Sequence, residues 1–231
     1  MLTLYRIGRR HPVYFLAFVF FIVIASVIIG LNNKVDCFIK LNPVHDRWLD
    51  IFFIGLTWLG DGLFSLLAAA LVVWFWKDYR LTIHIVIAYL ASGLAAQVMK
   101  RIWMAPRPRA IIETGLYKNF LAGISHTGFN SFPSGHTTSA FALATILALH
   151  SAKKGWGIFF LFLAIGVGYS RIYLGQHFLP DVTAGAILGT ATGLLVYGFI
   201  NINLRKRTAG KISATEALAE DPAYASNLAG N

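Results

Sequence analysis

The sequence predicts an all-α, polytopic membrane protein built as a bundle of six transmembrane helices. Of its 231 residues 57% are hydrophobic and only 13% are charged, whereas soluble domains are about 45–50% apolar and about 25% charged. The apolar residues fall in six long runs that short polar or basic segments separate. A run of about 20 residues is long enough to cross a hydrocarbon core roughly 30 Å thick.

Each run has a recognisable beginning and end. The first run is longer than the apolar region of a signal peptide, about 7–15 residues, so we expect it to be retained as a helix. The second is interrupted by Gly60-Asp61-Gly62. Because a carboxylate facing lipid is costly, Asp61 should face the bundle or a water-filled cavity, with a structural role favoured over a catalytic one. The six runs are residues 12–31, 51–76, 81–99, 133–150, 156–175 and 182–202.

The chain divides into a membrane domain and a tail. Residues 1–204 form the predicted six-helix domain, and residues 205–231 form a polar tail that we expect to be mostly disordered. His84 and His150 lie near the ends of their runs and are expected at the membrane interface. The only cysteine, Cys37, excludes an internal disulfide and a cysteine-based metal cage.

The net charge of +10 is explained better by membrane topology and anionic lipid head groups than by nucleic acid, because the basic residues cluster between apolar runs. An even number of spans puts both termini on one side, and the positive-inside rule makes that side cytoplasmic. The basic residues on that side are Arg6, Arg9, Arg10, Lys77, Arg80, Lys153, Lys154, Arg205, Lys206, Arg207 and Lys211.

The same span count places several polar groups on one membrane face. The end of the third span, the start of the fourth, the end of the fifth and the start of the sixth all face outward. These four ends carry Lys100 and Arg107, Ser134 and His136, Ser170 and Arg171, and His177 and Asp181. Separate polar stretches are therefore expected to converge on one outward-facing pocket.

The residue types in these stretches suit a phosphate. Lysine supplies a point charge and arginine a planar fork for phosphate oxygens, although Lys100 and Arg107, taken alone, fit snorkelling interfacial cations better. Pro133-Ser134-Gly135-His136 would open a helix whose first amides favour an anion; alternatively Ser134 is only an N-cap.

His177 and Asp181 form the third stretch, together with Arg171. A carboxylate near an imidazole fixes its tautomer and makes the other ring nitrogen a better nucleophile. A structural His–Asp contact that caps the sixth span would not explain Arg171. Pro180 leaves open whether the two side chains meet along one helix or across its beginning.

These motifs together resemble the type 2 phosphatidic acid phosphatase superfamily of membrane lipid phosphatases. That family shows Lys-x6-Arg-Pro, Pro-Ser-Gly-His and Ser-Arg-x5-His-x3-Asp. This chain has all three in order and without substitution, over roughly residues 50–200: Lys100-x6-Arg107-Pro108, Pro133-Ser134-Gly135-His136 and Ser170-Arg171-x5-His177-x3-Asp181.

The resemblance implies a phosphomonoester or diphosphate hydrolase that needs no metal and no other cofactor. It implies that His177 attacks phosphorus to give a phosphohistidine, that Asp181 orients it, and that His136 protonates the leaving oxygen. It also implies that the phosphoryl oxygens are held by Lys100, Arg107, Ser134, Gly135 and Arg171.

The expected partners are a lipid phosphate and membrane lipids, with no nucleic acid. The substrate candidates are undecaprenyl diphosphate, phosphatidylglycerophosphate, phosphatidic acid and lipid A phosphates, in a bacterial inner membrane with the site facing the periplasm or exterior. A lipid phosphotransferase with the same site and a non-catalytic lipid binder or transporter are the alternatives. Loss of a motif residue would favour the last of these, and none is lost.

Overall fold

The structure, a computed structural model, describes residues 11–113 and 115–219, and every regular element in that part of the chain is a helix. The all-α prediction is therefore confirmed for these residues. The elements are α2 (Pro12–Leu31), α3 (Lys34–Leu41), α4 (Arg47–Thr57), the 3₁₀ helix η1 (Trp58–Gly60), α5 (Gly62–Trp76), α6 (Tyr79–Trp103), α7 (Pro108–Ile111), α8 (Gly135–His150), α9 (Lys154–Tyr173) and α10 (Leu179–Ala219).

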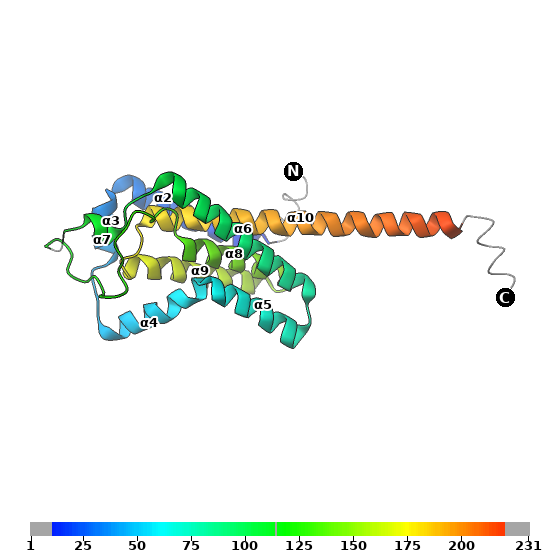
Figure 1. Ribbon diagram of the computed structural model, residues 1–231, viewed down its shortest axis with the longest axis horizontal. Coiled ribbons are helices and arrows are strands. Elements are labelled where there is room, and N and C mark those ends of the chain that lie inside the picture. Colours follow the sequence, from blue (N-terminus) through cyan, green and yellow to red (C-terminus); the bar gives the residue numbers. More distant parts are fainter. Residues whose placement is uncertain (1–10, 114, 220–231) are drawn as a thin grey trace.

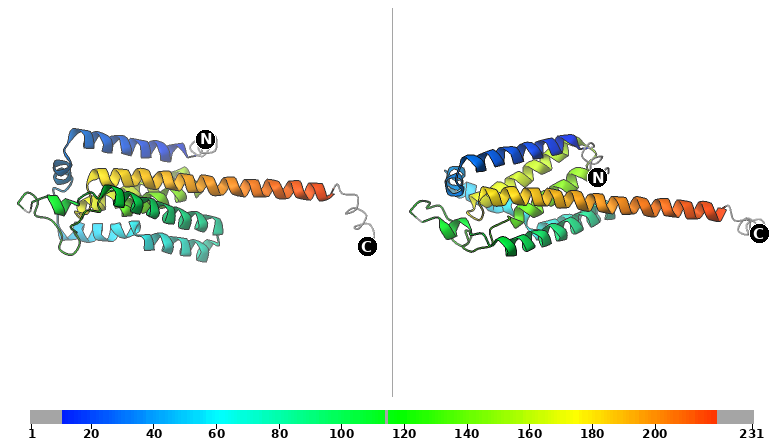
Figure 2. Two further views of the ribbon diagram at one scale, coloured as in Figure 1. Left: turned by 45° about the horizontal axis from the view of Figure 1, so that its top comes forward. Right: turned by 90° about the horizontal axis from the view of Figure 1, so that it is seen from above.

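The long helices lie roughly alongside one another in a bundle, with α3, α7 and the loop that follows α7 at one end (Figures 1 and 2). Its outer faces expose large apolar side chains, among them Leu16, Phe162 and Phe199, as a surface that faces the lipid of a bilayer does. Four helices are long and apolar enough to cross a membrane, and the pair α4–η1 and α5 would make five. The protein is thus an integral membrane protein.

The count of six spans stays a prediction because α8 has only 16 residues. This helix is the centre of the bundle, packed against α6, α9 and α10, and most of its side chains are buried. Its neighbours rather than lipid surround it, which explains why a short helix suffices there.

The prediction for the C-terminal tail needs correction, and some of the predicted residues lie outside the described part of the chain. The expected disorder from residue 205 is wrong up to residue 219, because α10 continues to Ala219 and projects beyond the bundle (Figure 1). Residues 205–219 include four alanines and four lysine or arginine residues, with no proline before Pro222, a composition that favours helix. Arg6, Arg9 and Arg10, which weigh in the orientation, and residues 220–231 lie outside the described part.

His84 is fully buried, not interfacial as expected. Its Nδ1 lies 2.6 Å from the Arg80 carbonyl oxygen, and its ring packs 4.8 Å from that of His150 and 5.2 Å from that of Tyr197. The aromatic neighbours and the carbonyl of the preceding turn let the histidine lie inside the bundle.

Glycines on α10 bring this helix close to α8. A Cβ at Gly185 would lie 2.7 Å from the Ser134 carbonyl oxygen, and one at Gly189 would lie 2.2 Å from the Thr138 carbonyl oxygen. Gly193 continues the same stripe at a four-residue spacing. Small residues at this spacing allow two membrane helices to approach closely, and here they align the beginnings of α8 and α10.

The second apolar run is broken where the sequence predicted an interruption. Asp61 lies between η1 and α5. The two halves are bent by 63°, and Figure 1 shows α4 and α5 running in different directions. Asp61 Oδ1 accepts a hydrogen bond from the Leu63 amide at 2.8 Å and so caps α5. The break positions the other carboxylate oxygen near the beginning of α8, 3.9 Å from His136 Nε2.

Candidate active site

The end of α9 sets the position of two candidate residues. Gly175 has φ +64°, its amide donates to the Ile172 carbonyl, and the Gln176 amide donates to the Arg171 carbonyl at 3.0 Å. This is the Schellman pattern, in which a left-handed glycine stops a helix and turns the chain. The turn places His177 directly beyond the helix end that carries Arg171.

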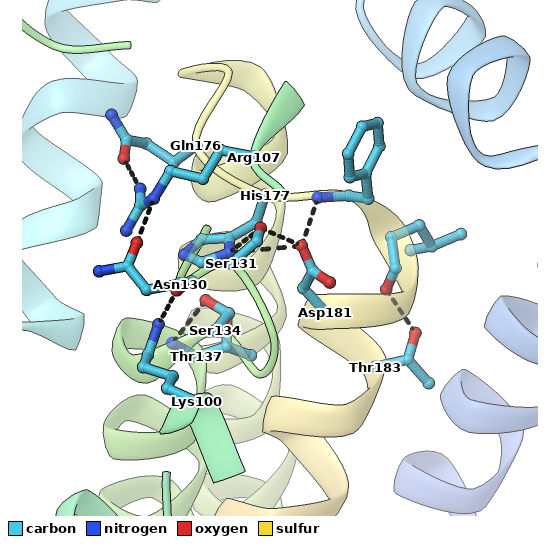
Figure 3. A network of polar contacts seen from close by, with 12 residues as sticks. Lys100, Arg107, Asn130, Ser131, Ser134, Thr137, Gln176, His177, Asp181 and Thr183 are labelled. Carbon is cyan, nitrogen blue, oxygen red and sulfur yellow. Dashed lines mark hydrogen bonds and ion pairs between the residues drawn. The ribbon is translucent and has the colours of Figure 1, made fainter. Parts of the chain in front are cut away.

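His177 and Asp181 meet through a third residue (Figure 3). The Ser131 hydroxyl donates to Asp181 Oδ2 at 2.6 Å, and its oxygen lies 3.2 Å from His177 Nδ1. The direct distance from His177 Nδ1 to Asp181 Oδ2 is 3.5 Å, which is longer than a normal hydrogen bond. Ser131 therefore bridges the imidazole and the carboxylate, with Nδ1 carrying the proton and Nε2 left free.

Asp181 belongs to the first turn of α10, whereas His177 precedes that helix. Asp181 Oδ2 also accepts from the Phe178 amide at 2.9 Å, as the third helical residue does in a capping box. The two side chains thus meet across the helix beginning rather than along one helix, which resolves the question that Pro180 left open.

His177 is 2% exposed and lies between the last residue of α9 and the first of α10. Burial lowers the pKa of the His177 imidazole to about 3, against the opposing effect of the Asp181 hydrogen bond and charge. The neutral form, with a free lone pair on one nitrogen, is therefore the resting state.

Three cations from separate elements gather around this imidazole. Lys100 Nζ donates to the Asn130 carbonyl at 2.5 Å, and Arg107 donates to the side-chain oxygens of Asn130 and Gln176 (Figure 3). Arg171 donates to Thr57 Oγ1 at 2.7 Å, while its buried Nε has no partner among the described residues. Arg107 and Arg171 both lie within electrostatic range of His136 and His177.

The beginning of α8 completes the site. Ser134 is the N-cap: its Oγ accepts from the Thr137 hydroxyl at 2.8 Å, so its own O–H remains available to donate. The Lys100 side chain lies beside Gly135, since a Cβ there would be 4.0 Å from Lys100 Cε. His136 Nε2 lies 3.9 Å from Asp61 Oδ2, and both side chains are about one-third exposed, at 33% and 38%.

The loop after α7 is held from outside by a second polar group. The Tyr117 hydroxyl lies 2.7 Å from His45 Nε2, His45 Nδ1 lies 3.4 Å from Asp50 Oδ1, and the Tyr173 hydroxyl donates to Asp50 at 2.7 Å. Burial lowers the pKa of His45, so Tyr117 can donate to a neutral ring. These contacts tie the loop that supplies Asn130 and Ser131 to α4 and to the end of α9.

The structure thus brings all eight predicted site residues to one end of the bundle. Four further residues contact them: Thr57, Asn130, Ser131 and Gln176. Asn130 and Ser131 closely precede the Pro-Ser-Gly-His motif, which is a weak signal, and Thr57 has none. The described residues hold no cluster of three or more histidine, cysteine, aspartate or glutamate side chains, and the positive charges suit an anion.

Comparison with known proteins shows which family the chain belongs to. The sequence profile of the PAP2 superfamily matches residues 81–205, which contain every predicted site residue. The chain belongs to the PAP2 superfamily. It is a phosphatase of that superfamily, so the resemblance seen in the motifs is confirmed.

Individual relatives agree with this assignment. The chain is 33% identical to the bacitracin transport permease protein BcrC of Bacillus licheniformis, over 72% of this chain and 75% of that protein. It is 30% identical to phosphatidylglycerophosphatase B of Bacillus subtilis, over 79% and 92%. The crystal structure of Aquifex aeolicus LpxE superimposes with a TM-score of 0.63 at 28% identity, covering 72% of this chain and 95% of that one.

Proposed function

We propose that this PAP2 phosphatase hydrolyses the phosphomonoester or diphosphate of a membrane lipid through a phosphohistidine on His177. The observation that supports it is the convergence of three cations on a buried, neutral imidazole whose Nδ1 is fixed by Ser131 and Asp181. Positioning and charge neutralisation carry most of the catalysis of phosphoryl transfer. The site offers both.

In the first step His177 Nε2 attacks phosphorus and the bond from phosphorus to the leaving oxygen breaks. His136 gives a proton to that oxygen; the negative charge of the bound phosphate and Asp61, 3.9 Å away, favour the imidazolium that donates it. Lys100, Arg107 and Arg171, with the Ser134 hydroxyl and the Gly135 amide, hold the phosphoryl oxygens. The positive charge that develops on His177 is stabilised through Ser131 by Asp181.

In the second step water attacks the phosphohistidine. His136, now neutral, takes the proton of the water, the bond from phosphorus to Nε2 breaks, and inorganic phosphate leaves. Both histidines return to their starting protonation states. No step in this sequence calls for a metal ion.

We further propose that the chain makes six spans with both termini in the cytoplasm of a bacterium, so that the site opens at the outer face of the inner membrane. The site residues lie at or near the end of α6, the beginning of α8, the end of α9 and the beginning of α10. These helix ends lie opposite the α5–α6 turn (Figure 1), which supports this arrangement. The name of one relative, phosphatidylglycerophosphatase B, indicates one substrate class, phosphatidylglycerophosphate. Undecaprenyl diphosphate, phosphatidic acid and lipid A phosphates are the others to compare.

The test is phosphate release from a panel of these four lipids by purified protein in EDTA. We expect hydrolysis of at least one lipid, abolished by His177→Ala. Full activity of His177→Ala would refute the proposed nucleophile. Transfer of labelled phosphate to a second lipid, with none released to water, would instead identify a phosphotransferase.

A further inference from the structure

Arg107 differs from the other two cations of the site in how its side chain is held. Lys100 and Arg171 lie in the last turns of α6 and α9, so each helix sets the direction of its side chain. Arg107 lies in the loop between α6 and α7, where its backbone is extended, with φ −78° and ψ 160°. No helix therefore fixes its guanidinium, and ordering a long arginine side chain costs rotamer entropy.

Two amide side chains hold this guanidinium instead (Figure 3). Arg107 Nε donates to Asn130 Oδ1 at 3.0 Å, and Nη1 donates to Gln176 Oε1. A guanidinium has five N–H donors and no acceptor, so both amides must turn their oxygens towards it. The two bonds use two of these donors, and within the described part of the chain the rest are left for phosphoryl oxygens.

The burial of Gln176 is explained by its contact with Arg107. The glutamine is 2% exposed, although this residue type is mostly exposed in proteins and an unpaired buried amide costs free energy. Its backbone amide ends α9 by donating to the Arg171 carbonyl, which any residue except proline could do. The side chain takes no part in that turn, and its oxygen is instead paired with the guanidinium.

The two amides also connect Arg107 to the proposed nucleophile. Gln176 directly precedes His177. Asn130 directly precedes Ser131, whose oxygen lies 3.2 Å from His177 Nδ1. Each of these two-residue segments has one member that forms or contacts the imidazole and one that contacts the guanidinium. The position of the guanidinium is therefore set relative to the imidazole.

We propose that Asn130 and Gln176 are positioning residues that hold the Arg107 guanidinium ready for the transition state before the substrate binds. The inference rests on the proposed function. In phosphoryl transfer the charge spreads over the equatorial oxygens, and donors already aimed at that charge need no reorganisation during the reaction. A loosened guanidinium still attracts the phosphate, whereas a misplacement of about 1 Å can cost about a hundredfold in rate. The loss should therefore appear in kcat rather than in KM.

The experiment removes one amide oxygen and measures kcat and KM with the lipid, among the four named above, that the wild type hydrolyses fastest. Gln176→Leu keeps most of the bulk of the side chain, and Gln97→Leu on the exposed face of α6 is the matched control. Gln176→Leu should lower kcat about tenfold, because Asn130 still holds the other donor. KM and the thermal midpoint should change little, and Gln97→Leu should leave all three quantities unchanged.

A second background shows whether the effect passes through Arg107. In Arg107→Lys a single amine replaces the planar fork, so no oriented guanidinium remains to be lost. Gln176→Leu should then change kcat by less than about twofold, as expected when two substitutions act through one group.

A kcat of Gln176→Leu equal to that of the wild type would overturn the inference. So would the same fractional loss in both backgrounds, because Gln176 would then act by another route than Arg107. If Gln176→Leu lowers the thermal midpoint, Asn130→Ala decides by the same comparison, since the Asn130 side chain is exposed. Failure of the folded wild type to hydrolyse any of the four lipids would refute the proposed function, and the inference with it.

Discussion

Ser131→Ala is the substitution that tests the bridge between His177 and Asp181. The hydroxyl donates to Asp181 Oδ2 at 2.6 Å and lies 3.2 Å from His177 Nδ1, whereas the direct histidine–aspartate distance is 3.5 Å. A hydrogen bond to a charged group contributes about 1.5–3 kcal/mol. If this bond acts in the transition state, its loss lowers kcat by about 10- to 150-fold.

The assay is steady-state phosphate release from a lipid phosphate, with KM and kcat determined separately. Because Ser131 has no hydrogen bond to Lys100, Arg107 or Arg171, the described residues proposed to hold the phosphate, KM should change little. Ser131→Thr, which keeps a hydroxyl, should retain most of the activity. Combining Ser131→Ala with Asp181→Asn should give a loss smaller than the product of the two single losses, since both act through one imidazole.

A different result would refute the bridge. If Ser131→Ala folds normally and keeps the kcat of the wild type, the 3.5 Å contact alone suffices and Ser131 is only part of the packing. A rise in KM at constant kcat would place Ser131 in substrate binding instead.

Three further predictions concern neighbouring features. Asp61→Asn removes the carboxylate 3.9 Å from His136, so kcat should fall more for a lipid alkyl ester than for phenyl phosphate, whose leaving group needs less protonation; equal losses would deny Asp61 this role. The pKa of His177 is lowered from 6.5 to about 3 in the folded protein, so the stability that its neutral form contributes is complete above pH 6.5. As the pH falls from 6.5 towards 3 this stability is lost, at up to about 1.4 kcal/mol per pH unit. The thermal midpoint should therefore fall more steeply below pH 6.5 in the wild type than in His177→Asn, and parallel curves would contradict this. Gly189→Ala would put a Cβ 2.2 Å from the Thr138 carbonyl oxygen and should cost about 1–3 kcal/mol, seen as a lower thermal midpoint in detergent; an unchanged midpoint would show that α10 does not need this close approach.

Much of the fold could be predicted because apolar runs report directly on membrane helices. The run 12–31 coincides with α2, and the interruption at Gly60-Asp61-Gly62 is a real break. Composition misled at one point and position along a run at another. The segment after residue 204 is polar but also rich in helix-forming residues, so α10 continues through it. His84 was judged by its place near a run end, whereas aromatic packing within the bundle buries it.

The candidate site could be predicted where residues lie close in sequence and only in part where they do not. The span count predicted Lys100, His136, Arg171 and His177 on one membrane face, and the structure has them at one end of the bundle. It gave no means to find Ser131, because a serine in a long loop carries no periodicity. The contact between Asp61 and His136 joins residues far apart in sequence and depends on a 63° bend that composition does not specify.

The most direct test of the central claim is to trap the phosphorylated enzyme. The wild-type protein would be mixed with a lipid carrying a labelled phosphate, quenched in alkali, which preserves phosphohistidine, and digested for mass spectrometry. The proposed mechanism predicts a phosphoryl group on the peptide that contains His177, and more of it in a variant whose second step is slowed, such as His136→Ala with a phenyl ester. Turnover without any label on His177, or activity that survives His177→Ala, would contradict it.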